Sequence, residues 1–302
     1  MSHLIDTHCH LHDREFFTAE QAEEMLKRAH EKGVEKIICI GTSHEDSLVA
    51  RDFASSHENV YWTYGIHPEE CSRMGISEMA PLGPRPAGPS GETELPRSDN
   101  RTSSVVSRLV VPSPRAAGAR PRAAALRIPS SEPFSDITVP EYPIAIGEVG
   151  LDYHYEGYER VAQIKLFEEM LQLAIDNDLP VSFHVREAFD DFFAVTSNFP
   201  AVRGVVHSFT DSKKVLKRIL NETDFYVGIN GLATYTTLPT PPLERILLET
   251  DAPFLTPIPF RGIINESAYI YDIAMWLSGK LGVDFKIIEK ETTKNAERLF
   301  DI

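Results

Sequence analysis

The chain has 302 residues, of which 42% are hydrophobic and 25% are charged, so it can bury a large core as an ordinary globular protein does. No stretch reaches the roughly 20 consecutive apolar residues of a membrane helix, and the first predicted strand begins near Leu4, so we expect neither a membrane span nor a signal peptide. The net charge of −15 excludes broad nonspecific binding of nucleic acid through a basic surface, although cations held in a local site can still attract a phosphodiester.

Strand-like and helix-like segments alternate along most of the chain. The predicted strands are Ile5–Thr7, Lys36–Gly41, Val60–Ile66, Ile144–Glu148, Val181–His184, Gly204–His207, Phe225–Ile229 and Ile246–Thr250. The predicted helices are Thr18–Lys32, Ser43–His57, Tyr158–Asn177, Glu187–Asn198, Asp211–Glu222, Ser267–Leu281 and Glu291–Phe300. Eight strands with helices between them predict an α/β protein, a (β/α)8 TIM barrel that spans residues 1–302 as a single domain.

Residues 76–140, in the loop after the third strand, do not fit this alternation. Residues 81–135 are rich in Pro, Ala, Gly and Ser, and they carry eight arginines against four acids. With few large apolar side chains, this segment cannot offset its ordering entropy, so we expect a disordered or loosely packed insertion. It could hold a nucleic-acid strand through its arginines, or it could be a low-complexity element without a role.

The three cysteines are an odd number and lie in or beside predicted strands: Cys9, Cys39 and Cys71. This usage predicts buried thiols in a reducing compartment and no disulfide framework. We therefore expect a cytoplasmic protein.

Two histidines end the first predicted strand, in Asp6-Thr7-His8-Cys9-His10. Alternation along an extended backbone sends His8 and His10 to the same side, about 6 to 7 Å apart at their Cα atoms. That spacing lets both imidazoles bind one cation, whereas a single buried histidine is more often a hydrogen-bonded core residue. His67 ends the third strand at the same rim, where it could contact substrate or support the metal ligands.

Glu148 ends an apolar strand between two glycines, Gly147 and Gly150. An isolated glutamate here could simply lie in a surface turn. Beside the histidines it predicts a carboxylate that bridges two cations, with the glycines allowing close approach of the backbone. His184 and His207 each end a later strand and would complete the ligands of the second cation.

Two further residues follow strand ends. Arg186 lies two residues after His184, on the same side of the strand, where its guanidinium could hold a phosphate oxygen or form an ordinary salt bridge. Asp251 follows the last strand, in Glu249-Thr250-Asp251-Ala252-Pro253, and could bind a metal and accept a proton from the attacking water. Because all strands of a parallel barrel end at one face, we expect these side chains to converge there.

The ordered combination of these motifs resembles the TatD family of metal-dependent deoxyribonucleases, within the amidohydrolase-like TIM-barrel superfamily. The resemblance covers residues 1–75 and 141–302, and it also includes the closing Asn295-Ala296-Glu297-Arg298-Leu299-Phe300. It implies two divalent ions (Mg²⁺, Mn²⁺ or Zn²⁺) and hydrolysis of DNA phosphodiester bonds, often from the 3′ end, with single strands or 3′ ends as the expected DNA substrate. The residues that it implicates are His8 and His10 for the first metal, Glu148 as the bridge, His184 and His207 for the second metal, Asp251 as ligand and base, and Arg261 for the substrate.

The chain departs from the family pattern at three places: Glu69 follows Pro68, Phe260 replaces a histidine, and Thr234 to Pro242 is about ten residues short. The short segment could leave one side of the barrel poorly covered, and together with the insertion at 76–140 the departures leave reduced activity or stability open. Two alternatives therefore stay open. The same ligands could hydrolyse a small amide or ester, or the chain could bind metals with reduced or lost turnover.

Overall fold

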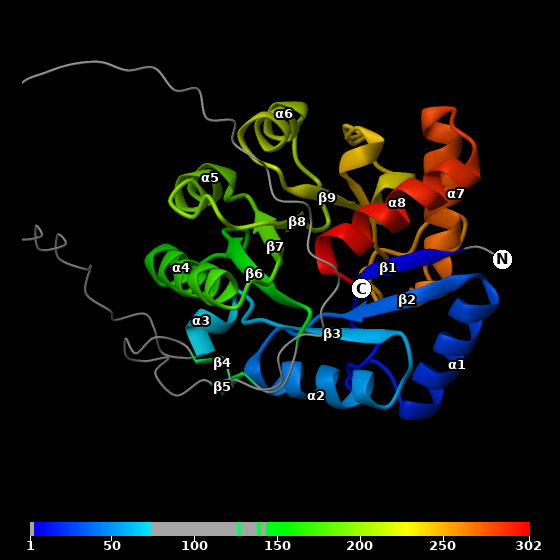
Figure 1. The fold of residues 1–302 in the computed structure, drawn as a ribbon, viewed down its shortest axis with the longest axis horizontal. Helices are drawn as coiled ribbons and strands as arrows, with labels where there is room; N and C mark the ends of the chain where they lie inside the picture. Colours follow the sequence, from blue (N-terminus) through cyan, green and yellow to red (C-terminus); the bar gives the residue numbers. More distant parts are fainter. Residues whose placement is uncertain (1–2, 74–125, 128–137, 140–142) are drawn as a thin grey trace, which may run out of the picture. The chain divides into compact units, whose positions relative to one another are not determined.

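The structure is a computed structural model and describes residues 3–73, 126–127, 138–139 and 143–302. Within these residues, eight parallel strands form one sheet in the order β1-β2-β3-β6-β7-β8-β9-β10, which curves into the barrel predicted from the sequence (Figure 1). The strands are β1 (Leu4–Cys9), β2 (Val34–Cys39), β3 (Val60–Tyr64), β6 (Ala145–Asp152), β7 (Val181–Arg186), β8 (Gly204–Val206), β9 (Tyr226–Ile229) and β10 (Ile246–Leu248). All eight predicted strands are therefore confirmed.

The first and last strands close the barrel at its C-terminal rim. The backbone N–H of Asp251 donates to the carbonyl of His8 at 2.8 Å, and that of His10 donates to the carbonyl of Ala252, also at 2.8 Å. Beside this seam the buried carboxylate of Asp6 accepts from the backbone N–H and the hydroxyl of Thr250, at 2.9 and 2.6 Å. Closure thus places residues that lie more than 200 positions apart next to each other.

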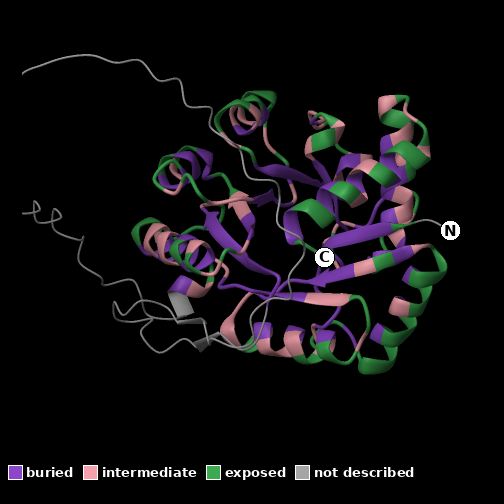
Figure 2. Cartoon of the chain, in the orientation of Figure 1, coloured by how far each residue is buried: buried purple, intermediate pink, exposed green. Residues whose placement is uncertain are grey.

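Helices surround the strands with their apolar faces turned inward, and the strands at the centre are almost wholly buried (Figure 2). The helices are α1 (Ala19–Glu31), α2 (His44–Ser55), α3 (Glu70–Arg73), α4 (Arg160–Asp176), α5 (Phe189–Thr196), α6 (Lys213–Glu222), α7 (Ile270–Leu281) and α8 (Phe285–Phe300). Ser43 is the N-cap of α2, as predicted, because its side chain accepts from the N–H of Asp46. The last helix begins six residues earlier than expected, because Asp284 caps it by accepting from the N–H of Lys286.

Phenylalanine packing holds β7 against the helices that follow and precede it. Phe183 in β7 lies with its ring centroid 6.0 Å from that of Phe167 in α4 and 5.2 Å from that of Phe192 in α5, and all three side chains are fully buried. Burial of each such ring contributes about 1.5–3 kcal/mol. The neighbouring His184 therefore lies on a strand that is anchored by buried ring packing on both sides of the connection.

The connection from β9 to β10 has no α-helix. Two 3₁₀ turns, Gly231–Thr234 and Leu243–Arg245, replace the helix, in agreement with the short segment in the sequence. Helix α8 instead contacts β1, β10 and the second 3₁₀ turn. The buried side chain of Asn295 in α8 donates to the carbonyls of Leu243 and Ile246, at 3.0 and 2.9 Å. The expected gap is therefore covered by the C-terminal helix.

The predicted insertion at 76–140 lies almost entirely outside the described residues, and its disorder stays a prediction. Two described pieces, β4 (Leu126–Arg127) and β5 (Thr138–Val139), pair as antiparallel strands. Cys9, Cys39 and Cys71 are free and buried, as expected. Among the helices that the structure describes, none combines the length and apolar character needed to cross a bilayer.

Candidate metal centre

The six predicted ligands meet at the C-terminal rim of the barrel. They are His8 in β1, His10 just after it, Glu148 in β6, His184 in β7, His207 directly after β8 and Asp251 three residues after β10. Glu148 lies at the centre, with an imidazole nitrogen of each of the four histidines within 4.0 Å of its carboxylate. The expected convergence is confirmed.

One oxygen of Glu148 faces a first group of donors. Oε2 lies 3.6 Å from His8 Nε2 and 4.0 Å from His10 Nε2, and Asp251 Oδ1 lies 3.6 Å from each of these nitrogens. Metal–donor bonds of about 2.0–2.2 Å let one cation touch donors that are up to about 4 Å apart. His8 Nε2 is buried without a hydrogen-bond partner. An orphaned lone pair among two carboxylates and a second imidazole fits a cation site.

The other oxygen of Glu148 faces a second group. Oε1 lies 2.7 Å from His184 Nδ1 and 2.8 Å from His207 Nε2, and these two nitrogens are 3.4 Å apart. The Nε2 atom of His67 lies 3.8 Å from the same oxygen, so a third imidazole is within reach of this group. A cation here would replace the protons that now join these atoms. The two oxygens of Glu148 thus face separate sets of donors.

The pKa values of the centre follow from burial and from neighbouring charge. Burial alone would raise the pKa of Glu148, but the charge of His207 and hydrogen bonds from His184, His207 and His8 hold it well below its ordinary value. Burial disfavours a charged His207, yet Glu148 raises the pKa of that ring to about 10. Burial and the charge of His207 lower the pKa of His8 to about 4. His8 is therefore neutral at pH 7, which is the form that binds cations.

Local backbone geometry aims two of these ligands. Asp251 has a φ of 57°, in the left-handed region that aspartate tolerates better than most residues, and this turn places its carboxylate beside His8. Gly150 lies against β7, where a Cβ would come within 1.9 Å of the carbonyl oxygen of His184. Only glycine allows β6 and β7 to approach so closely, and this approach brings Glu148 to His184.

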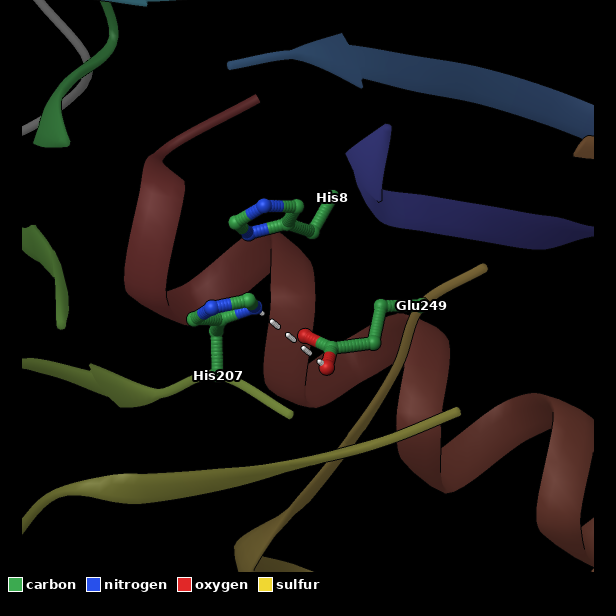
Figure 3. A group of neighbouring side chains, drawn as sticks. All are labelled: His8, His207 and Glu249. Atoms are coloured by element: carbon green, nitrogen blue, oxygen red, sulfur yellow. Dashed lines mark ion pairs between the residues drawn. The ribbon is translucent and has the colours of Figure 1, made fainter. Parts of the chain in front are cut away.

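Two buried carboxylates, Asp152 and Glu249, lie near the histidine nitrogens that point away from Glu148. Neither was assigned a role from the sequence. Asp152 Oδ2 lies 2.8 Å from His184 Nε2. Glu249 Oε1 lies 3.9 Å from His207 Nδ1, beside the His207 ring, which stacks parallel to the ring of His8 with the two centroids 4.0 Å apart (Figure 3). Carboxylates in such positions orient metal-binding imidazoles. Both were detectable in principle, because each lies an even number of residues from a predicted ligand on the same strand end.

Glu249 is fully buried, with its Oε1 accepting from the backbone N–H of Ser208. Burial raises its pKa to about 8, and its Oε2 has no hydrogen-bond partner. The space for this oxygen exists because residue 228 is glycine, where a Cβ would lie 2.3 Å from Oε2. His207 Nδ1 is likewise buried and unpartnered. Glu249 and Glu148 therefore face opposite nitrogens of the same imidazole.

The centre opens into a pocket of about 710 Å³ whose wall includes His67, Arg186 and Asp251. Arg186 lies with its guanidinium 5.4 Å from the ring centroid of Tyr155 and donates to the hydroxyl of that residue at 3.4 Å, and it forms no ion pair with a carboxylate among the described residues. Arg261 stacks on Tyr235 at 3.7 Å and is not part of this wall. The substrate contacts predicted for His67, Arg186 and Arg261 stay predictions.

Comparison with known proteins agrees with this geometry. The sequence model of a family described as TatD related DNase matches residues 5–301. An uncharacterized metal-dependent hydrolase of Bacillus subtilis, YabD, is 27% identical over 99% of both chains. A protein of Erwinia billingiae named 3′-5′ ssDNA/RNA exonuclease TatD is 27% identical over 93% of this chain and 94% of its own. The crystal structure of the TatD homologue YJJV of Escherichia coli has a TM-score of 0.70 at 23% identity, covers 99% of this chain and 98% of its own, and shows the same fold.

Proposed function

The chain belongs to the family of TatD-related DNases and is a metal-dependent hydrolase, and we propose that it cleaves the phosphodiester bonds of DNA. The observation that carries this proposal is the position of Glu148, whose two oxygens face two separate groups of histidines. A glutamate so placed can hold two cations side by side. Two-cation sites of this kind are common in enzymes that hydrolyse phosphate esters.

Each ligand of the centre has a place in this scheme. His8, His10 and Asp251 would hold one cation, His184 and His207 the other, and Glu148 both. Cations bound there would lower the pKa of a water molecule towards neutrality and offset negative charge on the phosphate. Asp251 lies at the open side of the site and accepts the proton that the attacking water gives up. Arg186, in the pocket wall, pairs with a non-bridging phosphate oxygen.

We propose single-stranded DNA, degraded from its 3′ end, as the substrate. The Erwinia relative, which is named a 3′-5′ ssDNA/RNA exonuclease, supports this direction and this strandedness. The net charge of −15 supports a short footprint, because the protein as a whole repels a polyanion and only the cation-bearing pocket attracts it. The free, buried cysteines are consistent with the proposed cytoplasmic location.

The test is an assay of purified protein on single-stranded DNA labelled at its 3′ end, with Mg²⁺, Mn²⁺ or Zn²⁺ supplied singly. We expect release of labelled mononucleotides that stops when a chelator is added. Asp251→Asn should lower this rate at least about 100-fold, because the water then lacks its proton acceptor. Silence on DNA under all three metals, with hydrolysis of a small amide or ester, would instead place the chain with the amidohydrolases.

A further inference from the structure

Two phenylalanines are exposed at the mouth of the metal pocket. Among the described residues, phenylalanine is buried or half-buried except at Phe16, 45% exposed, and Phe254, 47% exposed. Both line this pocket. Exposure of large apolar rings is unfavourable in water, and its coincidence with the candidate site points to a ligand that covers them.

The two rings form one surface beside the first group of donors. Phe16 comes from the loop after β1 and Phe254 from the loop after β10, and their centroids are 5.2 Å apart in an edge-to-face arrangement. The Phe254 ring lies 6.5 Å from the ring of His10. This arrangement leaves ring surface open to the pocket beside His10, one of the candidate ligands.

The charges around the pocket mouth explain why an aromatic surface there would add to substrate affinity. Asp13 and Glu69 line the pocket together with Arg186, so these two acids offset the attraction of the guanidinium for a phosphate backbone. Stacking on an aromatic ring does not depend on charge, and it works with any base because every base has a π-face. A strand held weakly by its phosphates outside the centre therefore needs contacts to its bases.

We propose that Phe16 and Phe254 form a stacking surface for the base of a nucleotide next to the scissile phosphate. This inference rests on the proposed nuclease function and assigns two residues that set substrate affinity. Tyr155, 55% exposed and in contact with Arg186, lies in the same pocket wall and offers a further exposed ring to the strand. A single strand exposes the base faces that this surface requires, whereas a duplex keeps them stacked.

The experiment uses three 5′-labelled single-stranded oligonucleotides: one complete, one abasic at the 3′-terminal nucleotide and one abasic at the penultimate nucleotide. Each is degraded by the wild type, Phe254→Leu, Phe16→Leu and Phe254→Tyr. Leucine keeps the position apolar but removes the π-face, and tyrosine restores it. Loss of stacking on one base corresponds to roughly 5- to 150-fold in affinity, so we expect KM for the complete strand to rise about tenfold in either leucine variant, with kcat within twofold.

The abasic strands supply the decisive comparison. The wild type should lose about tenfold in kcat/KM on one of the two abasic strands, and the leucine variants should lose no more than twofold on that same strand relative to the complete one. Phe254→Tyr should behave as the wild type. Ile287→Ala, which removes an exposed apolar side chain on α8 outside the pocket wall, should change nothing.

Equal sensitivity of wild type and leucine variants to both abasic strands would overturn the stacking surface while leaving the nuclease function intact. A wild type that cleaves none of the three strands would instead remove the proposed function. Metal content, measured on every variant, confirms that the leucine substitutions leave the centre assembled.

Discussion

Replacement of Glu148 by glutamine tests the metal centre at its most connected point. The side chain is 5% exposed, and its oxygens lie 2.7 and 2.8 Å from His184 and His207 and 3.6 Å from His8. Glutamine keeps the size and one oxygen but removes the negative charge. Every predicted contact with a cation therefore weakens, while the packing of β6 stays unchanged.

The size of the effect follows from the charges around His207. Its pKa rises from 6.5 to about 10, with Glu148 as the largest favourable cause. Since one pKa unit corresponds to about 1.4 kcal/mol, the net rise corresponds to about 5 kcal/mol. Burial opposes this rise, so the favourable charges of Glu148, Glu249 and Asp251 together contribute at least that much. We expect Glu148→Gln to destabilise the metal-free protein by about 3 kcal/mol. The affinity for both cations should fall at least about 100-fold, because each site loses a charged donor.

The assay measures bound Zn²⁺ or Mn²⁺ by competition with a chromophoric chelator, and thermal unfolding in the presence of chelator. Glu289→Gln is the matched control, since Glu289 is equally buried at 5% but lies in α8, where it pairs with Lys286. The control should keep both cations. If Glu148→Gln also binds two cations within threefold of the wild-type affinity, Glu148 does not bridge them and the proposed arrangement is wrong.

Three further predictions follow from the geometry. Gly150→Ala should destabilise the protein by at least about 3 kcal/mol and lower its metal content, because the new Cβ meets the carbonyl of His184. The control is Gly279→Ala in α7, where the new Cβ meets open space, and thermal unfolding should find it neutral or slightly stabilising. Asn295→Ala should cost about 2–4 kcal/mol, seen as a lower unfolding temperature with unchanged metal content per folded chain, since two buried carbonyls lose their donor. Cation affinity should rise with pH between 6 and 9, because His207, with a pKa of about 10, must release its proton to bind a cation. Calorimetry in buffers of different ionisation enthalpy should detect the released proton. Binding without proton release would contradict the charge state assigned to His207.

The short connection between β9 and β10 shows why a departure from the family pattern need not weaken the barrel. The sequence predicts missing residues at 234–242, and the structure has no α-helix between β9 and β10, where two 3₁₀ turns, Gly231–Thr234 and Leu243–Arg245, flank the short segment. The expected exposure of that side is avoided because α8 packs on β10 and Asn295 satisfies the carbonyls of the turn. Lost stability at this point is therefore not a necessary consequence of the shortened segment.

The pattern of apolar runs and polar strand ends was enough to predict the barrel and the convergence of six candidate ligands at its rim. Each strand is specified locally, by a short run of apolar residues between turns, and a parallel barrel brings every strand end to one rim whatever the loops contain. The candidate ligands were then identified as the histidines and acidic residues at or just after the end of each apolar strand.

The contacts between individual side chains at the rim could not be predicted in the same way. That Glu148 faces two groups of histidines, that Asp152 and Glu249 contact the far nitrogens of His184 and His207, and that closing hydrogen bonds join Asp251 to His8 all depend on distances between remote segments. Such distances are set when strands of particular side-chain volume pack at a particular register, as the close approach at Gly150 illustrates. The sequence around each residue does not determine these distances, because they depend on how remote segments pack in the folded chain.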